Sequence, residues 1–501
     1  MIKVLSKIKI SVKSFLKGDI EFNRNFLFLA LIIFSAYLLF NNLSVNPLST
    51  DGYYYANLSK NMVINNDYIT FVNADNEIDF TSGKGHLFYW IYALSGALLG
   101  FSDFAMRLPA AVLGFACVII VFLFLSKRRG YKFAFISAAV LLLTQQFLHH
   151  SRAVHPDGNF AVFFTFAVFA FYIAVSGDKP LFYYLFGICL AISISIRQAV
   201  GLFIIPVVFF YVLTIPERKK IFLNKHLWLS LILAVLIVLP WYIAAYDKYG
   251  EKFLIEYLAT PYKILTGANF ETSPFDDSGR ITYLNILLAN YQPWFIFLIV
   301  GSFVTIKKII KEKLIFNQSF EKFIIIWAYI PLILFLAMSG HKYYFLLPLY
   351  IPFSMLSAFG LLYVFRKKGG NAVISYLLTA LMLLSFLCFA FKLFPRTLDN
   401  QHYVNTVKIL PEMNAVGDNG DKIYTLDRAK YYNALLMFYR DKPNVIHIEE
   451  NEFMEMFNSS KQYYFVVYKK TFDEIGNTIE AQIIGRTKED VLFTNKKRDN
   501  F

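Results

Sequence analysis

Apolar blocks of bilayer length fill this chain from residue 26 to residue 395. They run for about 17 to 25 residues, which is the length that an α-helix needs to cross a bilayer. Only 17% of the residues are charged and 57% are hydrophobic, whereas soluble domains carry about 25% charged residues. The sequence therefore predicts an all-α polytopic membrane protein. Three cysteines lie inside such blocks, without metal-ligand spacing, and are expected to fill the core: Cys117, Cys189 and Cys388.

The placement of lysine and arginine predicts the topology. A formal net charge of +14 would suit a nucleic-acid-binding protein, but the basic residues gather in short turns between apolar blocks, notably 127–132, 217–225 and 307–313. Such turns are typical of cytoplasmic loops. We therefore expect no nucleic-acid partner. We expect about eleven spans, at most about thirteen, in a cytoplasmic (inner) membrane, with the N-terminus inside.

This topology divides the chain into three expected regions. Residues 1–25 form a basic cytoplasmic segment that faces anionic membrane lipid. Residues 26–395 form the transmembrane domain, whose long outer loops are 44–103 and 247–285. The second loop is polar and is expected to contain no span. Residues 396–501 form a small domain on the outer side.

Three apolar segments need separate interpretation. The run 87–100 is too short to span and begins with aromatic residues, so it is expected to be a helix along the outer interface. The stretch 181–214 is interrupted by Arg197 and Gln198, which predicts a hairpin of two short spans. The run 26–40 has no small-residue cleavage pattern and is expected to remain as a membrane anchor.

The C-terminal region has the pattern of an α/β domain. Strand-like segments alternate with helical ones: strands at 422–427, 444–449 and 462–470, and helices at 428–440 and 451–457. The region contains no Gly-rich phosphate loop, nucleophile elbow or Cys/His cluster. We therefore expect a packing or acceptor-docking module here in preference to a second catalytic site.

Ionisable residues gather at the predicted outer ends of separate spans. Charged groups at bilayer depth are costly and usually mark a site or a pathway, and basic residues should be depleted outside. Asp51 follows the first span, and Lys84 closes the same loop. The other residues in this set are His86, Arg107, His149, His150, Arg152, His155, Asp157, Arg197, His341 and Lys342.

Two carboxylates and four cations make up the candidate site. Asp51 is predicted to be a catalytic base, with capping of a helix that begins at Gly52 as the alternative. Asp157 is predicted to be catalytic or to orient a nearby cation or acceptor, again with helix capping as the alternative. The predicted phosphate-binding cations are Lys84, Arg152, Arg197 and Lys342. For each cation alone, snorkelling at the interface is the alternative. The residues expected to contact substrate are Tyr54, His86, His155 and Tyr343.

The histidines raise the question of a metal. His149, His150 and His155 are close in sequence, but their spacing is not a helical i, i+4 pair. Zinc would also need a carboxylate or a further histidine within reach. We therefore assign no metal ligand and expect no required cofactor, while a divalent metal stays an open alternative.

Several motifs follow one another in a recognisable order. They are TDGYYYANLSKNM (50–62), KGHLFYW (84–90), FAMRLPAA (104–111), SRAVHPDGNF (151–160), PWYIAAYDKYG (240–250), PWF (293–295) and KYYFLLPLYIP (342–352). The series resembles the GT-C-type membrane glycosyltransferases. Within these it is most similar to the branch of the lipid A aminoarabinose transferases and the protein O-mannosyltransferases. The resemblance covers residues 26–395.

The resemblance implies a polyprenyl-phosphate-linked sugar as donor and an acceptor hydroxyl that attacks it outside the membrane. The acid of the first outer loop matches Asp51, and the acid that starts the fourth span matches Asp157. The cations of the family match Lys84, Arg152 and Arg197.

The sequence also departs from the family. An acidic residue often follows the first-loop Asp, where this chain has Gly52. The lipid A branch has Glu-Lys before the aromatic helix, where this chain has GKGH (83–86). In that branch the Glu is linked to a metal site. Its absence here therefore argues against carrying over either the metal site or aminoarabinose as the sugar. The WWDYG-type motif of oligosaccharyltransferases is absent, which argues against transfer of a whole glycan to asparagine.

The residues and the resemblance together predict an inverting displacement. The acceptor hydroxyl belongs to lipid A, another glycan or a protein, Asp51 takes its proton, and the cations stabilise the leaving lipid phosphate. A transporter or flippase of a lipid-linked or anionic solute is the first rival, which predicts inverted repeats and ionisable residues near mid-span. A non-catalytic scaffold that presents the C-terminal domain is the second.

Overall fold

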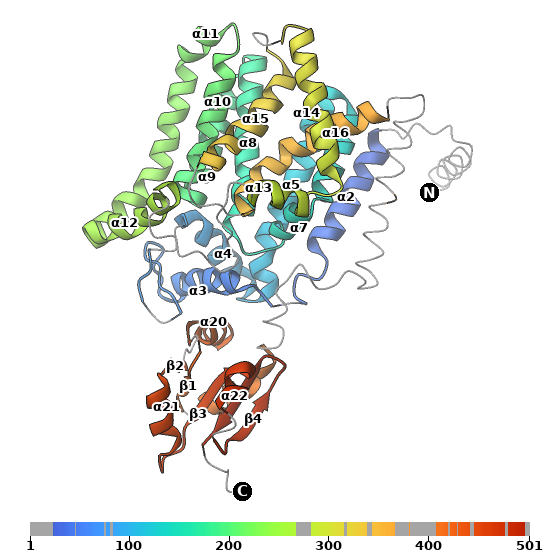
Figure 1. The fold of residues 1–501 in the computed structure, drawn as a ribbon. Helices are drawn as coiled ribbons and strands as arrows, with labels where there is room; N and C mark the ends of the chain where they lie inside the picture. The colour runs from blue at the N-terminus through green and yellow to red at the C-terminus, as the bar shows by residue number, and fades with distance from the viewer. Residues whose placement is uncertain are drawn as a thin grey trace, which may run out of the picture.

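A bundle of long apolar helices and a small mixed sheet make up this protein, shown by a computed structural model (Figure 1). The structure describes residues 24–45, 47–74, 77–80, 84–266, 282–314, 318–337, 343–365, 380, 407–418, 421–427, 429–440, 445–475 and 479–495. Residues 1–23 of the basic segment, the apolar run 373–394 (expected to be the last span) apart from residue 380, and the residues His341, Lys342 and Cys388 lie outside the described residues.

Most helices of the first part coincide with apolar blocks, whereas the helices at 50–64 and 218–222 lie in segments predicted as loops. In chain order the helices are α2 (Arg24–Phe40), α3 (Thr50–Ile64), α4 (His86–Leu99), α5 (Asp103–Arg129), α6 (Tyr131–Leu142), α7 (Gln145–His150), α8 (Pro156–Gly177), α9 (Pro180–Arg197), η1 (Gln198–Phe203), α10 (Ile204–Leu213), α11 (Arg218–Phe222), α12 (Lys225–Thr266), α13 (Thr282–Asn290), α14 (Trp294–Lys311), α15 (Phe320–Ala337), η3 (Tyr343–Leu349) and α16 (Tyr350–Val364).

Six stretches of the described residues are long and apolar enough to cross a membrane, and a bent pair makes a seventh if it is counted as one span. The six are 103–129, 156–177, 180–213, 225–259, 320–337 and 343–364. The bent pair is 283–290 with 294–311, at an angle of 116°. Helices α2, α4 and α6 are apolar but shorter. The protein is therefore a multi-pass membrane protein.

The stretch 180–213 turns back on itself. Asp178 precedes α9 and Lys220 follows α10, yet their side chains form an ion pair at 2.8 Å. Gly201 of η1 packs against the backbone of residues 193 and 194, where an added Cβ would lie 2.6 Å from the amide nitrogen of Ile194. The break comes at Gln198, which has φ 49° and ψ −131°. The hairpin predicted around Arg197 and Gln198 is therefore present.

Basic turns meet at one end of the bundle. Glu321, at the start of α15, pairs with Lys308 of α14 at 2.7 Å and with Arg129 at the end of α5. This end lies at the top of Figure 1, whereas α3, α4 and the C-terminal sheet lie at the bottom. The basic turns and the first outer loop therefore lie at opposite ends of the bundle, as the predicted topology requires.

The second outer loop differs from its prediction. Residues 247–266 are helical, because α12 continues beyond its membrane-length part with a break at Gly250 (φ 60°, ψ −141°). Phe253 and Tyr257 are buried while Ile255 and Tyr262 are exposed, so this half of α12 is an amphipathic helix. Its charged residues concealed that periodicity in the sequence.

The apolar run 286–306 is long enough for one span, but the structure does not form it as one straight helix. The membrane-length helix is α14, which begins only at Trp294, and α13 lies at 116° to it. Tyr291 to Pro293 separate the two helices. Pro293 lies at the bend, where a proline cannot supply the amide proton that a continuous helix needs.

The C-terminal part is a mixed α/β sheet, as predicted. Its elements are η4 (Val407–Ile409), α19 (Leu410–Asp418), β1 (Ile423–Thr425), α20 (Ala429–Arg440), β2 (Val445–His447), α21 (Glu450–Phe457), β3 (Tyr464–Tyr468), α22 (Lys469–Ile475), β4 (Gln482–Arg486) and β5 (Asp490–Thr494). The strand order is β2-β1-β3-β5-β4. Strands β2, β1 and β3 are parallel, and β5 is antiparallel to both β3 and β4.

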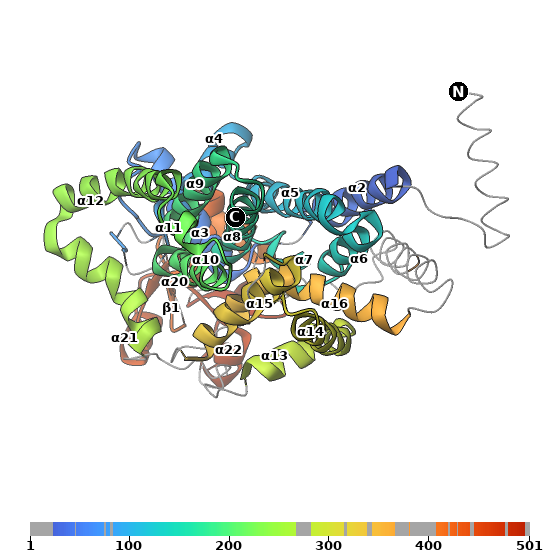
Figure 2. The same ribbon diagram turned by 90° about the horizontal axis from the view of Figure 1, so that it is seen from above.

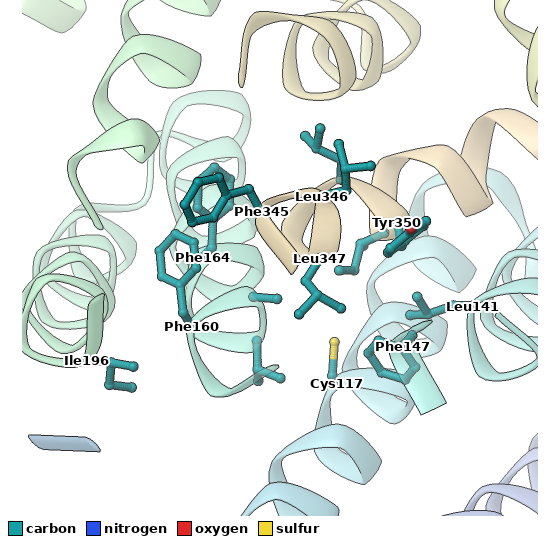
Figure 3. Close-up of a cluster of buried hydrophobic side chains, with 14 of the residues drawn as sticks. Cys117, Leu141, Phe147, Phe160, Phe164, Ile196, Phe345, Leu346, Leu347 and Tyr350 are labelled. Atoms are coloured by element: carbon teal, nitrogen blue, oxygen red, sulfur yellow. The ribbon is translucent and has the colours of Figure 1, made fainter. Parts of the chain in front are cut away.

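The membrane bundle has a dense aromatic and aliphatic core where η3 enters it (Figure 3). Phe345 and Leu347 of η3 lie in the same buried cluster as Phe160 and Phe164 of α8. Cys117 also lies there as a free, buried thiol, and Cys189 is buried too. Both cysteines therefore fill the core as predicted.

Candidate active site

An ion pair between Asp157 and Arg197 lies at the centre of the candidate site. Arg197 Nε donates to Asp157 Oδ1 at 2.8 Å, and the two side chains are only 2% and 1% exposed. They come from the first turn of α8 and the last residue of α9. A buried charge pair must be closely matched because each charge has lost its hydration. The prediction that Asp157 orients a cation fits this contact.

Neither predicted carboxylate caps its helix. His155 is the N-cap of α8 and accepts a hydrogen bond from the Asp157 amide, and Pro156 occupies the first helical turn. Ser49 is the N-cap of α3, where its hydroxyl accepts from the amide of Gly52. The capping alternatives for Asp51 and Asp157 were therefore wrong. Both acids lie in the first turn, where the helix dipole favours a negative charge.

Lys84 is brought to this pair by the backbone. The Gly85 amide donates to Ile196 O at 3.0 Å, which fixes the loop to the end of α9 one residue before Arg197. The approach is so close that a Cβ on Gly85 would lie 2.0 Å from Ser195 O. Lys84 itself is buried. Its glycine neighbour therefore permits the contact that places two cations, Lys84 and Arg197, in one site.

Two tyrosines that the sequence analysis did not single out lie among these charges. Lys84 Nζ lies 5.9 Å from the centre of the Tyr55 ring, and Arg197 Cζ lies 5.8 Å from that of Tyr344. Burial and the negative charge of Asp51 raise the pKa of Tyr55 well above its usual value, so its hydroxyl keeps its proton. Tyr55 is four residues after Asp51, a spacing that places the two on one helix face. That spacing was the available signal.

Tyr54 and Tyr343, the two tyrosines predicted to contact substrate, are the chain neighbours of Tyr55 and Tyr344. Tyr54 donates its hydroxyl to Asp79 in the first outer loop. Tyr343 is partly exposed and packs beside His150, with 5.8 Å between ring centres. Asp51 interacts electrostatically with both tyrosines. They therefore border the site in the structure, and their contact with substrate stays a prediction.

Two histidines of the site, His150 and His155, are buried and neutral. Burial lowers the pKa of His155 well below its usual value, and the neighbouring charges of Lys84, Arg197 and His149 lower it further. The ring of His155 lies 4.9 Å from that of Tyr344. Burial likewise lowers the pKa of His150 well below the usual range. His155 therefore caps α8 and packs against Tyr344 as an uncharged side chain.

His86 belongs to a separate aromatic cluster. Its ring stacks on Trp241 of α12 with 4.4 Å between centres, and Trp90 contacts its edge. Burial lowers the pKa of His86 to about 3. The predicted substrate contact of His86 would require an opening of this stack. Instead, the stack joins α4 to α12.

Arg152 contacts the first helix. It donates to the carbonyl oxygens of Leu38 and, at 2.7 Å, Asn41, at the end of α2. These bonds satisfy the last carbonyls of α2, a stabilising position for a cation. Phosphate binding by Arg152 stays a prediction, and it would have to be compatible with these two bonds. Lys342 lies outside the described residues.

The chemistry available at this site is that of an anion site beside a carboxylate. Lys84 and Arg197 supply the positive charge. Asp51 lies exposed in the first turn of α3, near enough that Asp51 and Arg197 both interact electrostatically with Tyr55. No group of three or more His, Cys, Asp or Glu side chains that could hold a metal occurs in the part of the chain that the structure describes.

Comparisons with known proteins concern the sequence and the fold of this chain. The family described as dolichyl-phosphate-mannose-protein mannosyltransferase matches residues 84–243. In solved structures, the fold resembles that of ArnT from Cupriavidus metallidurans bound to undecaprenyl phosphate, with a TM-score of 0.70, 13% identity, and coverage of 93% of this chain and 98% of that one. The chain therefore resembles the GT-C-type membrane glycosyltransferases in both sequence and fold.

Three further proteins are similar to this chain. The undecaprenyl phosphate-α-4-amino-4-deoxy-L-arabinose arabinosyl transferases of Shewanella sediminis and Aeromonas hydrophila are each 24% identical to it, over 64% and 66% of this chain. These matches span only 57% and 59% of the length of the two relatives. The apo oligosaccharyltransferase of Archaeoglobus fulgidus shares the fold with a TM-score of 0.52 and 14% identity, over 95% of this chain and 75% of that one.

Proposed function

We propose that this chain transfers a sugar from a polyprenyl-phosphate donor to an acceptor hydroxyl on the outer side of the cytoplasmic membrane. The observation that carries the proposal is the buried Asp157–Arg197 pair with Lys84 beside it and Asp51 close by. A lipid phosphate is the anion that a membrane protein with this fold would meet at such a position. The family match and the undecaprenyl phosphate named in the related ArnT structure support that choice of donor.

The cations would hold the donor phosphate. Asp157 accepts from the Nε edge of Arg197, which fixes the plane of the guanidinium. We assign the terminal N–H groups of Arg197 and the ammonium of Lys84 to the phosphate oxygens, where charge grows as the bond breaks. Arg152 and Lys342 are further candidates for this role.

Asp51 would act as the base. The acceptor oxygen attacks the anomeric carbon, the bond from that carbon to the phosphate oxygen breaks with its electron pair going to the phosphate, and the hydroxyl proton passes to the Asp51 carboxylate. Attack opposite the leaving group inverts the anomeric configuration. Phosphate is a good leaving group, so the proposal needs no metal. The acceptor is lipid A, another glycan or a protein hydroxyl.

The packing around Gly52 accounts for the lack of a second acidic residue directly after Asp51. A Cβ at this position would lie 3.1 Å from Leu48 Cβ and 3.2 Å from Ser49 Oγ. The side chain of a second acid would therefore crowd the cap of α3. The local packing supports a site with a single acid here, at Asp51.

We further propose about eleven spans with the N-terminus inside. The hairpin at 180–213 contributes two, and the shorter helices α2 and α6 would cross as well. The region 396–501 would then lie outside, next to α3. Residues 26–395 would form the catalytic domain, and 1–25 would lie against the inner leaflet.

The proposal is tested with purified protein in liposomes that contain undecaprenyl-phosphate sugars. We expect loss of the lipid-linked sugar and release of undecaprenyl phosphate only when an acceptor is supplied, together with an inverted anomeric linkage in the product. Movement of the intact lipid-linked sugar between leaflets without its cleavage would overturn the proposal and favour the flippase alternative.

A further inference from the structure

The C-terminal domain contacts the helix that carries Asp51. Its helix α20 packs on α3, where the rings of Phe438 and Tyr53 lie 5.3 Å apart. Figure 1 shows α20 directly beneath α3, between that helix and the sheet. Tyr53 is fully buried by this contact. The contact joins two parts of the chain that are nearly four hundred residues apart, as the hydrogen bond between Tyr53 and Tyr439 shows, with a sequence separation of 386.

Hydrogen bonds around Asp103 link three elements at one point. Tyr439 Oη donates to Asp103 Oδ2 at 2.8 Å, and the Tyr53 and Tyr439 hydroxyls are 2.8 Å apart. A hydroxyl has one proton to donate, so Tyr439, whose proton goes to Asp103, accepts from Tyr53, and Tyr53 Oη is also placed to donate to Asp103 Oδ1 at 3.4 Å. Asp103 Oδ1 also accepts from the amide of Leu48 at 3.2 Å. The three elements are α5, the start of α3, and α20.

These bonds hold the chain just before and just after Asp51, in the first turn of α3. Leu48 lies three residues before Asp51, and Tyr53 lies two residues after it; both are bonded within the same group around Asp103. Residues two apart on a helix point to nearly opposite sides, since each residue turns about 100°. Tyr53 therefore holds the face of α3 that is opposite to Asp51.

A buried lysine holds the same face two turns later. Lys60 Nζ donates to Met437 O at 2.9 Å and to Phe438 O at 2.6 Å, near the end of α20. Lys60 is seven residues after Tyr53, so the two share a helix face. A cation at the last carbonyls of a helix is favoured by their partial negative charge. The ammonium is only slightly exposed, and these carbonyls are acceptors for it.

We propose that α20 is a positioning element for Asp51. The C-terminal domain would hold α3 through Tyr439 and the carbonyls that Lys60 binds, and so keep the carboxylate at the correct distance from the donor bound to Lys84 and Arg197. This inference rests on the proposed function, because it assigns a task to Tyr439 in the same reaction. It gives the C-terminal domain a role in the chemical step without any residue that touches substrate.

The test uses Tyr439→Phe in the full-length protein. This change removes one hydroxyl and keeps the ring against Tyr53. We expect kcat to fall about tenfold, since small misplacement of a catalytic group is costly, while the KM for the donor changes less than twofold. Hydrogen exchange of the amides of residues 50–64 should rise about tenfold. The matched control, Tyr424→Phe, lies in β1 of the same domain and should change neither quantity.

A second variant keeps the inference falsifiable. Tyr53→Phe removes the same hydrogen bond from the other side, so it should reproduce the fall in kcat, and the double variant should be little worse than either single one. An unchanged kcat and unchanged exchange in Tyr439→Phe would overturn the inference. So would an equal loss in Tyr424→Phe. Absence of turnover by the wild-type protein would count against the proposed function instead, and the exchange data would still decide whether α20 holds α3.

Discussion

At the scale of single residues, Asp51 is the group on which the proposed chemistry depends most. We expect Asp51→Asn to lower kcat by about 10²- to 10⁴-fold, the usual contribution of a general base. The amide keeps the shape and stays in the first turn of α3, which Ser49 still caps. Binding of undecaprenyl phosphate should be unchanged, as measured by fluorescence titration. Activity within a few fold of the wild type would remove Asp51 from the mechanism.

The Asp157–Arg197 pair should matter for stability and for donor binding together. Asp157→Asn leaves the buried guanidinium without its carboxylate, and breaking one side of a buried pair costs about 3–5 kcal/mol. We expect a lower thermal midpoint in detergent and weaker binding of undecaprenyl phosphate. Asp178→Asn is the matched control, because its ion pair with Lys220 is 68% exposed on both sides and contributes little. Equal midpoints for the two variants would contradict the prediction.

Because several of its histidines are buried, the protein is expected to become less stable at acidic pH. The pKa of His155 is lowered well below its usual value by burial and by Lys84, Arg197 and His149. Above about pH 6.5, His155 is neutral in both the folded and the unfolded chain, so it adds no pH dependence. Below that pH the unfolded chain binds a proton that the folded chain does not, and the free energy of unfolding falls.

Thermal midpoints between pH 8 and pH 5 measure this effect. We expect a decline that starts near pH 6.5, and a shallower decline in His155→Gln, which removes one of the contributing groups. His86 and His150 contribute in the same direction, because burial lowers the pKa of each. The slope of His155→Gln should therefore be reduced without reaching zero. A slope identical to that of the wild type would refute the assignment to His155.

At the scale of elements, the loop before α4 is positioned by the absence of a side chain. In Gly85→Ala the new Cβ would collide with Ser195 O, which lies 2.0 Å away and belongs to a helix backbone. The loop must move away from α9, and Lys84 moves with it from Arg197. We expect donor affinity to fall more than kcat. Gly177→Ala is the control, since its Cβ would meet only the flexible Lys179 side chain at 3.4 Å. A donor affinity as high as that of the control would contradict this role.

The sequence predicted elements well where one physical pattern dominated. The continuous apolar runs 104–125 and 160–175 coincide with most of α5 and α8, and the positions of Arg197 and Gln198 predicted the hairpin. The same reasoning failed beyond Asp247, where α12 is amphipathic and its apolar face is narrow. It also missed β5, whose five residues are all buried, so that no polar alternation marks it. Bends such as the one between α13 and α14 depend on tertiary packing.

The residues of the candidate site were also only partly predictable from the sequence. Charge placed at predicted span ends pointed to Asp157, Arg197 and Lys84, which the fold does bring together. Helix phase would have been needed to prefer Tyr55 over Tyr54, and the contact of Arg197 with Tyr344 depends on how η3 enters the bundle. These are long-range relations between elements. A single sequence without the fold does not encode them in any local pattern.

At the scale of the whole molecule, the two ends of the bundle are predicted to face different compartments. Lys220 lies at the basic end and is well exposed, and Lys461 is an exposed residue of the C-terminal domain. In intact cells, a membrane-impermeant maleimide should label Lys461→Cys at once, but Lys220→Cys only after permeabilisation. The native Cys117 and Cys189 are buried, and the unsubstituted chain supplies the background. Labelling of both positions in intact cells, or of Lys220→Cys alone, would reverse or break the proposed topology. It would also place the Asp51 loop on the wrong side for a lipid-linked donor presented outside.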